Sequence, residues 1–308
     1  MTIARIRAAL GGVSGVHVTP YAADGSVDTA MLARVVKRIA TAGVHNIVSC
    51  GNTGEYYALE PGEVERVQHA AIEANAGHAV LTVAVGRSRG EAIAATRTMA
   101  RAGAHAAMVH HPVDPFAAPH AQAAYFEAIA EASPIPVVAY VRSDAIGVND
   151  LVRLAAHPNL AGLKFATTNL MLLAACLREA SHAAAVWVCG LAEGWAAPFY
   201  ALGARGFTSG LVNVWPERSL AIHEALEAGH YPVARRLVDG IAGFEQLRAR
   251  HGNGANVTVV KEAMGMLGMK VGPVRHPGAD ILDPADRERL AAIVAGWNIS
   301  RTARAVAE

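Results

Sequence analysis

Eight short apolar segments in the first two-thirds of the chain are the strongest constraint on its fold. They occupy residues 15–19, 44–50, 80–86, 104–110, 135–140, 161–165, 185–190 and 204–209. Several are apolar nearly throughout rather than alternating with polar residues, which is typical of parallel strands that are buried on both faces. The segments therefore predict a largely parallel sheet.

The stretches between these strands have the sequence marks of amphipathic helices. Residues Leu32, Val35, Val36 and Ile39 form one apolar stripe at helical spacing. A second helix is predicted to begin at Pro61, because proline is favoured at the first helical position. A third is predicted between Ser88, which forms a capping-box pattern with Glu91, and Gly103.

Eight strand–helix pairs within the first 215 residues match a TIM (β/α)8 barrel in number and length. An open doubly wound sheet is the main alternative, but it usually has a glycine-rich phosphate loop after its first strand, where this chain has Thr19-Pro20-Tyr21. After Pro216 only helical patterns remain, at residues 216–228, 232–250, 257–267 and 284–297. We therefore expect an α/β chain, with a barrel catalytic domain at residues 1–215 and a C-terminal helical region at residues 216–308 packed on it.

Composition excludes several classes of partner. Lys and Arg total 27 against 26 for Asp and Glu, so the net charge of +1 gives no electrostatic footprint for nucleic acid or an acidic membrane surface. With 53% hydrophobic residues the chain can bury a large core. No apolar run approaches the roughly 18 residues of a membrane span, and the first ten residues lack the marks of a signal peptide. Three cysteines without a CxxC motif suggest a reducing compartment, so a soluble cytoplasmic enzyme is expected.

Lys164 stands inside an apolar run, Leu160-Ala161-Gly162-Leu163-Lys164-Phe165. Burial of a lysine lowers its pKa, and a neutral amine is what Schiff-base formation with a carbonyl substrate requires. A lysine that snorkels from a strand end to solvent is the alternative interpretation. Since catalytic groups of barrel enzymes lie at the C-terminal ends of strands, Lys164 is a candidate nucleophile.

Tyr140 closes the preceding apolar strand, so it is expected beside Lys164. Its hydroxyl could transfer protons at the barrel mouth, while the ring packs below. A purely structural role, capping the core, is the alternative. The two residues on neighbouring strands argue for a site more strongly than either does alone.

The second strand runs into Gly51-Asn52-Thr53-Gly54-Glu55. Small residues around a polar pair allow backbone N–H groups to form an anion-binding nest, to which the Thr53 hydroxyl adds a donor. A plain turn before the next helix fits the same pattern. Near an amine, this loop would suit a substrate carboxylate.

Other polar residues give weaker signals. Arg142 could hold a second substrate carboxylate or lie in a solvated loop. The histidines at 105, 110 and 111 have no carboxylate or cysteine at a matching spacing, so no metal site is predicted. Ser209 and Asn213 could reach the barrel mouth after the eighth strand.

Together these residues resemble the dihydrodipicolinate synthase and N-acetylneuraminate lyase family of Schiff-base-forming lyases. The resemblance rests on Val18-Thr19-Pro20, Gly51-Asn52-Thr53-Gly54-Glu55, Tyr140, Gly162-Leu163-Lys164, Gly190 and Ser209. It implies a barrel in which Lys164 forms an imine with a 2-oxo acid and Tyr140 is the acid/base. It also implies that Asn52 and Thr53, between Gly51 and Gly54, bind the carboxylate.

The family resemblance further implies a homotetramer, a dimer of dimers, that needs no metal or organic cofactor. Departures from the family pattern bear on the substrate. Dihydrodipicolinate synthases usually have a tyrosine pair after the fourth strand that completes a proton relay, but this chain reads Pro112-Val113-Asp114-Pro115. After Tyr140 it reads Val141-Arg142-Ser143 in place of the usual Asn-x-Pro.

These departures favour the branch that acts on 2-keto-3-deoxy sugar acids, by dehydration or by retro-aldol cleavage. Gly190, Ser209, Arg142 and Asp114 are candidate substrate contacts, the last two toward distal hydroxyls or a second carboxylate. Three alternatives remain: dihydrodipicolinate synthase itself, a pyruvate-dependent hydratase-aldolase that takes aromatic aldehydes, and a non-catalytic sugar-acid-binding protein.

Overall fold

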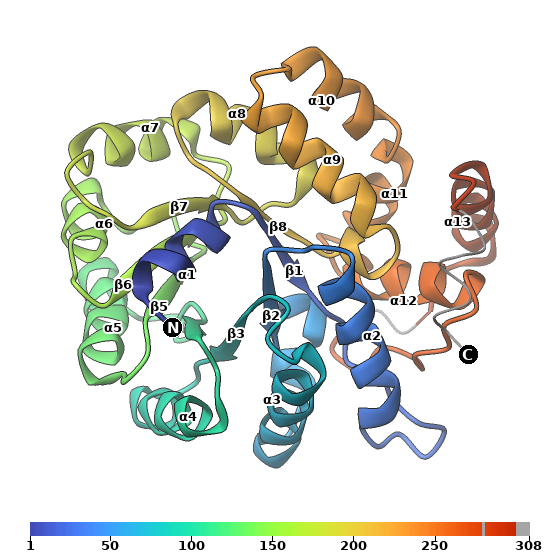
Figure 1. Cartoon of the computed structure of the whole chain (residues 1–308), viewed down its shortest axis with the longest axis horizontal. Coiled ribbons are helices and arrows are strands. Elements are labelled where there is room, and N and C mark those ends of the chain that lie inside the picture. Colours follow the sequence, from blue (N-terminus) through green and yellow to red (C-terminus); the bar gives the residue numbers. More distant parts are fainter. Residues whose placement is uncertain (279–280, 300–308) are drawn as a thin grey trace. The chain divides into compact units, whose positions relative to one another are not determined.

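Eight strands form a closed barrel in the order β1-β2-β3-β4-β5-β6-β7-β8 (Figure 1). The computed structural model describes residues 1–278 and 281–299. The strands are β1 (Val13–Val16), β2 (Asn46–Ser49), β3 (Val80–Val85), β4 (Ala106–Val109), β5 (Val137–Val141), β6 (Leu160–Phe165), β7 (Val186–Cys189) and β8 (Phe207–Ser209). Strands β3 to β8 pair in parallel with their sequence neighbours, which confirms the predicted TIM barrel.

Helices connect the strands and follow the last one. They are α1 (Ile3–Leu10), α2 (Thr29–Thr41), α3 (Pro61–Asn75), α4 (Arg89–Ala102), α5 (Pro119–Ala132), α6 (Val148–Ala155), α7 (Leu170–Glu179) and α8 (Glu193–Leu202). The C-terminal helices are α9 (Pro216–Glu227), α10 (Tyr231–Asp239), α11 (Ala242–Arg248), α12 (Asn256–Met266) and α13 (Pro284–Gly296). Short 3₁₀ helices are η1 (Asn52–Gly54), η2 (Tyr56–Ala58) and η3 (Leu211–Asn213).

The chain divides into two compact units. The first unit contains residues 1–14 and 80–208, and the second contains residues 15–79 and 209–308. Each unit combines segments that are distant in sequence. The predicted boundary after residue 215 stays a prediction.

In the first unit, strands β4 to β6 are buried along their whole length, as their continuous apolar sequences predict. Helix α1, which the sequence analysis did not predict, contacts β6 and β7 (Figure 1). The Arg7 guanidinium at its end donates a hydrogen bond of 3.0 Å to the Leu160 carbonyl, where β6 begins. This helix therefore packs against the strand that carries Lys164.

Local signals place the helix ends where the sequence predicts them. The Ser88 hydroxyl accepts a 3.2 Å bond from the Glu91 N–H, and the Glu91 carboxylate accepts a 3.0 Å bond from the Ser88 N–H. Helix α4 ends at Gly103, whose φ of 102° is left-handed. Helix α3 begins at Pro61, as predicted. The start of each helix depends only on residues within one helical turn of it, which is why the sequence predicts where the helix begins.

In the second unit, the single helix predicted at residues 232–250 is wrong. Two helices, α10 and α11, occupy that range. Helix α10 is followed by Gly240, a poor helix former, and Ile241 then leaves the helical conformation with φ −117° and ψ 1°. The fully buried side chains of Ile241 and Phe244 explain the turn, because tertiary burial overrides the helical pattern.

Helix α2 buries the apolar face that its sequence predicts. In α2 the stripe of Leu32, Val35, Val36 and Ile39 is buried, as its spacing predicts. Across residues 1–278 and 281–299, no helix combines the length and apolarity needed to cross a bilayer.

Gly162 should tolerate no larger residue. A Cβ at this position in β6 would lie 2.7 Å from the Val186 carbonyl oxygen of β7, a backbone atom that cannot move without distorting the strand. We expect Gly162→Ala to lower the free energy of unfolding by about 1–3 kcal/mol, the usual effect of overpacking. Urea denaturation followed by circular dichroism measures it.

Gly194→Ala is the matched control, because a Cβ on Gly194 in α8 would meet no atom within 4 Å. This second variant should be neutral or slightly more stable, since alanine favours helix. Equal stability of the Gly162 variant and the wild type would contradict the close approach of β6 and β7.

Candidate active site

Lys164 lies one residue before the end of β6, a strand of the first unit that is buried along its whole length. It occupies β6 between Leu163 and Phe165, which are both fully buried. Only 4% of the Lys164 residue surface is exposed. The lysine therefore does not snorkel to solvent, and the alternative interpretation of its position is wrong.

Tyr140 is the direct neighbour of Lys164 across the sheet. The two residues are paired in the register of β5 and β6. Partners in parallel register have their side chains on the same face of the sheet. The Lys164 Nζ lies 3.8 Å from the centroid of the Tyr140 ring, and Tyr140 is itself buried. The two side chains that the sequence put forward are thus brought into contact.

The environment of Lys164 favours a neutral amine. Burial, the largest cause, and the positive charge of Arg142 together lower the pKa of Lys164 to about 7, while Cys189 opposes the shift. An unperturbed lysine has a pKa of about 10.4. Near neutral pH a large fraction of the Lys164 side chain is therefore unprotonated, which is the form that attacks a carbonyl carbon.

His110 and Arg142 complete the surroundings of Tyr140. His110, the residue after β4, is buried, and its ring centroid lies 5.8 Å from that of Tyr140. The Arg142 guanidinium carbon lies 5.9 Å from the Tyr140 centroid, and the Arg142 side chain is exposed. From the sequence, His110 was a candidate only for a metal site. Its place one residue beyond a buried strand is the signal that could have identified it as a neighbour of Tyr140.

Two predicted contacts in the first unit have local explanations. Asp114 is exposed, and its carboxylate accepts a 2.9 Å bond from the Phe116 N–H within the loop between β4 and α5. Gly190 donates a 2.8 Å bond to the Phe165 carbonyl, and a Cβ there would lie 2.6 Å from the Ala166 Cβ. The close approach of two backbones therefore accounts for this glycine without a substrate.

The Gly51–Gly54 loop belongs to the second unit and is a tight 3₁₀ turn. Gly54 donates a 2.9 Å bond to the Gly51 carbonyl, and the Thr19 hydroxyl donates one of 2.7 Å to the Gly54 carbonyl. Thr53 is buried. A Cβ on Gly51 would lie 2.6 Å from the Val16 side chain, so a larger residue would push the loop away from β1.

Ser209 and Asn213 serve the interior of the second unit. The Ser209 hydroxyl lies 3.1 Å from the Ser219 hydroxyl and accepts a 3.2 Å bond from the Val212 N–H. The Asn213 side-chain oxygen accepts a 3.0 Å bond from the Val18 N–H, and its NH₂ donates to the Val16 and Gly210 carbonyls. Asn213 therefore fastens η3 to the end of β1, and its expected place at the barrel mouth stays a prediction.

The three cysteines are buried and free of disulfide bonds. Burial raises the pKa of Cys189 to about 12, so its thiol is an inert packing group rather than a nucleophile. Across the part of the chain that the structure describes, no group of three or more His, Cys, Asp or Glu residues could hold a metal ion. The chemistry of the residues around Lys164 is that of an amine, a phenol and an imidazole.

Curated relatives carry two kinds of name. A Streptomyces coelicolor protein named "Probable 5-dehydro-4-deoxyglucarate dehydratase 1" is 31% identical over 277 residues, covering 87% of this chain and 86% of the relative. A Methanosphaerula palustris protein named 4-hydroxy-tetrahydrodipicolinate synthase is 33% identical over 289 residues, covering 92% of this chain and 96% of the relative.

Solved structures agree with the fold and the sequence likeness. The crystal structure of dihydrodipicolinate synthase from Oceanobacillus iheyensis is similar with a TM-score of 0.93 and 33% identity, covering 97% of this chain and 100% of that one. The model of the dihydrodipicolinate synthetase family matches residues 9–295. The chain is thus an enzyme of the lyase class that belongs to the dihydrodipicolinate synthetase family.

Proposed function

We propose that the chain forms a Schiff base between Lys164 and the C2 carbonyl of a 2-keto-3-deoxy sugar acid, and dehydrates it. The observation that carries the proposal is the buried Lys164, with a pKa of about 7 and its Nζ 3.8 Å from the Tyr140 ring centroid. An amine without its proton at neutral pH attacks a ketone, and loss of water gives an iminium ion.

The iminium ion acts as an electron sink for the next step. It acidifies the C3 proton, whose removal gives an enamine; the enamine then expels the hydroxyl on C4, which leaves as water after taking up a proton. Tyr140 is the proposed proton carrier at both stages. Hydrolysis of the resulting unsaturated imine returns the free Lys164 amine and releases the 2-oxo acid product. Cleavage of the C3–C4 bond instead would give pyruvate and an aldehyde.

Asn52 and Thr53 are the proposed partners of the substrate carboxylate. Three features support this role: the small residues Gly51 and Gly54, the tight turn between them and the family pattern that they share. In a TIM barrel, the loops after the strands carry the site at the C-terminal face. Arg142 is the proposed partner of a second, distal carboxylate, because an exposed guanidinium can bind one with two hydrogen bonds.

Dihydrodipicolinate synthesis from pyruvate and aspartate semialdehyde is the second candidate. The 33% identity to a 4-hydroxy-tetrahydrodipicolinate synthase supports it. Against it stands the segment Pro112-Val113-Asp114-Pro115, which has no tyrosine for the proton relay of such synthases. Relatives named as dehydratases, at 29–31% identity, favour the sugar acid.

We also propose that the enzyme works in the cytoplasm as a homotetramer. The three unbridged buried cysteines fit a reducing compartment. The loop before α5 exposes Phe116 by 93% and Val113 by 67%, an apolar pair that a second subunit would cover. Light scattering on the purified protein measures the assembly, and a monomer at micromolar concentration would contradict it.

Loss of the amine should abolish imine formation. With pyruvate and borohydride, the wild type should gain a pyruvate-derived adduct on the peptide that contains Lys164, while Lys164→Ala should gain none and should have no turnover. Tyr140→Phe should form the adduct but turn over about 10² to 10⁴ times more slowly, the usual contribution of a general acid or base. Peptide mass mapping and assays with keto-deoxy sugar acids, and with pyruvate plus aspartate semialdehyde, measure these outcomes.

The same experiment separates the candidates. No adduct with any 2-oxo acid tried would rule out the lyase and favour a binding protein, which ligand-dependent thermal shift without turnover would support. Turnover only with aspartate semialdehyde would favour the synthase.

Imine formation should depend on pH through the titration of Lys164. Since its pKa is lowered to about 7, the rate with limiting pyruvate should rise about tenfold per pH unit below pH 7 and level off above it. Arg142→Gln removes a nearby positive charge, so it should raise the pKa of Lys164 and move this midpoint to higher pH. Stopped-flow rates between pH 5 and 10 measure both midpoints.

Arg153→Gln is the control for a loss of charge, because Arg153 is an exposed residue of α6 that pairs with Glu127 and Asp150. Its midpoint should equal that of the wild type. A wild-type midpoint near 10, the ordinary lysine value, would contradict the buried environment of Lys164.

A further inference from the structure

Glu55, the residue that follows the Gly51–Gly54 loop, has an unusual backbone conformation. Its φ of 60° and ψ of 34° are left-handed, and so is the φ of 59° at Cys50, the residue before the loop. Left-handed conformations are strained for residues other than glycine and persist only where the surroundings hold them. The loop proposed to bind the substrate carboxylate is thus bracketed by two strained residues.

A buried ion pair holds Glu55 in this conformation. Its carboxylate lies 2.5 Å from the Lys261 Nζ, and each of the two side chains is only 3% exposed. The second carboxylate oxygen accepts a 2.8 Å bond from the Arg275 N–H. Both partners come from the C-terminal region, more than 200 residues further along the chain.

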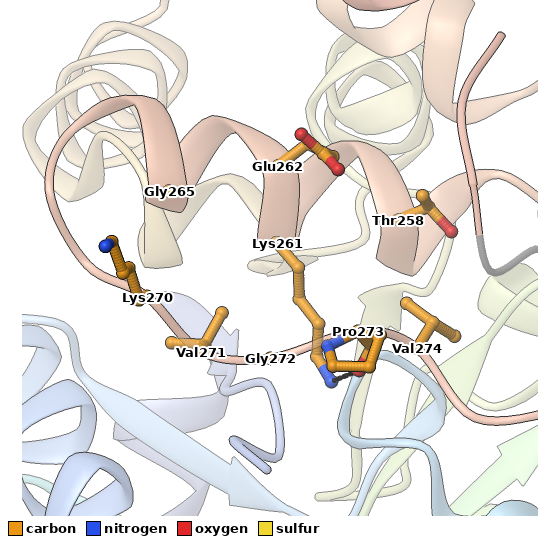
Figure 2. Close-up of a pocket in the computed structure, with 9 residues that line it drawn as sticks. All are labelled: Thr258, Lys261, Glu262, Gly265, Lys270, Val271, Gly272, Pro273 and Val274. Carbon is orange, nitrogen blue, oxygen red and sulfur yellow. Dashed lines mark hydrogen bonds between the residues drawn. The ribbon is translucent and has the colours of Figure 1, made fainter. Parts of the chain in front are cut away.

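Lys261 is as fully engaged as Glu55. It points from α12 toward the segment 271–274, whereas Glu262 points to the other side of the helix (Figure 2). The Lys261 ammonium donates a 2.8 Å bond to the Pro273 carbonyl and lies 4.3 Å from the centroid of the Tyr21 ring. A pocket of about 200 Å³ opens beside it, lined also by Thr258 and Lys270. These contacts fix the Lys261 side chain at a single position.

The segment that meets Glu55 is also fixed to the stretch of chain that follows β1. The Tyr21 backbone N–H donates a 2.9 Å bond to the Val271 carbonyl, and a Cβ on Gly272 would lie 2.4 Å from the Tyr21 carbonyl oxygen. The Arg275 guanidinium lies 4.2 Å from the Tyr21 centroid and binds both carboxylate oxygens of Glu63 in α3. The Tyr21 ring therefore contacts two cations, Lys261 and Arg275, and both residues are also partners of Glu55.

We propose that Glu55 and Lys261 are positioning residues whose ion pair holds the Gly51–Gly54 loop in the conformation that binds the substrate carboxylate. This inference rests on the proposed function, since it assumes that the loop binds that group. Neither residue needs to touch the substrate. Once the pair is broken, the strained Glu55 backbone can relax, and the loop then loses the conformation that we propose for carboxylate binding.

The ion pair is expected to affect the conformation of the loop more than the free energy of unfolding. Replacing both members of a buried pair is often neutral for stability, whereas removing one member leaves an uncompensated buried charge. Burial raises the pKa of Glu55 and lowers that of Lys261, while the charge of each partner opposes the shift of the other. The interaction can therefore be tested with single and double variants.

The experiment compares two carbonyl compounds that differ in the carboxylate. Pyruvate and acetone are each trapped on Lys164 with cyanoborohydride over a range of concentrations, and intact-mass spectrometry measures the rate of adduct formation. Glu55→Gln keeps the shape of the side chain but removes its charge. It should raise the half-saturating concentration of pyruvate by about tenfold or more and leave the second-order rate with acetone within a factor of two of the wild type.

Lys261→Met should have the same effect on pyruvate. Equal slowing of pyruvate and acetone trapping in a folded variant would overturn the inference. So would an unchanged half-saturating concentration of pyruvate in a folded Glu55→Gln variant. If either single variant fails to fold, the double variant Glu55→Gln/Lys261→Met carries the test, because it leaves no unpaired charge: a tenfold loss for pyruvate alone supports the inference, and wild-type binding overturns it.

Glu262→Gln is the matched control. It is the next residue on α12 and forms a more exposed pair with Arg287 at 3.0 Å. Removing the charge of Glu262 should change neither the trapping of pyruvate nor the trapping of acetone. A wild type that forms no adduct with pyruvate would instead refute the proposed function, so the two failures are distinguishable.

Discussion

The burial of one amine is the constraint on which the proposed chemistry depends. A parallel strand inside a closed barrel is covered on both faces, so a lysine placed there loses nearly all of its water. Loss of hydration disfavours the ammonium form and shifts the pKa of Lys164 to about 7. The position of Lys164 in the barrel thus favours the unprotonated amine that the proposed imine chemistry requires.

The neighbours of Lys164 adjust this balance in opposite directions. Arg142 opposes the charged form, whereas the face of the Tyr140 ring, with its centroid 3.8 Å from Nζ, favours a cation. The register of β5 and β6 fixes this second contact, because it sets Tyr140 directly beside Lys164. The backbone pairing of β5 and β6 brings the Tyr140 and Lys164 side chains into contact, and both residues lie within strands rather than in a loop.

Features with partners close in sequence could be predicted, and those with distant partners could not. The capping pair of Ser88 and Glu91 lies within one turn of helix. Lys164 can be recognised as unusual because the residues around it in the sequence are apolar. The two-helix arrangement of residues 231–248 depends on the burial of Ile241, which the local pattern does not reveal. The pairing of Glu55 with Lys261 joins segments more than 200 residues apart, and no local signal marks it.

Glycine is ambiguous in the same way. The sequence suggested that Gly190 contacts the substrate, but a glycine is required equally by the 2.6 Å that would separate its Cβ from that of Ala166. Gly272 likewise allows the C-terminal segment to approach the Tyr21 carbonyl, with a φ of 75°. Only the three-dimensional structure distinguishes a glycine that leaves space for a ligand from one that lets another stretch of backbone come close.

The division of labour between strands and loops explains why relatives of similar identity carry different names. Imine formation needs only an amine and a proton carrier, and the proposed ones are the paired residues Lys164 and Tyr140. Condensation adds a second substrate and a further proton transfer, for which the segment Pro112-Val113-Asp114-Pro115 offers no tyrosine. Dehydration moves protons within a single bound molecule, so it makes no demand on that loop. This chain retains the strand residues and lacks the loop tyrosine, which supports the proposed dehydration over condensation.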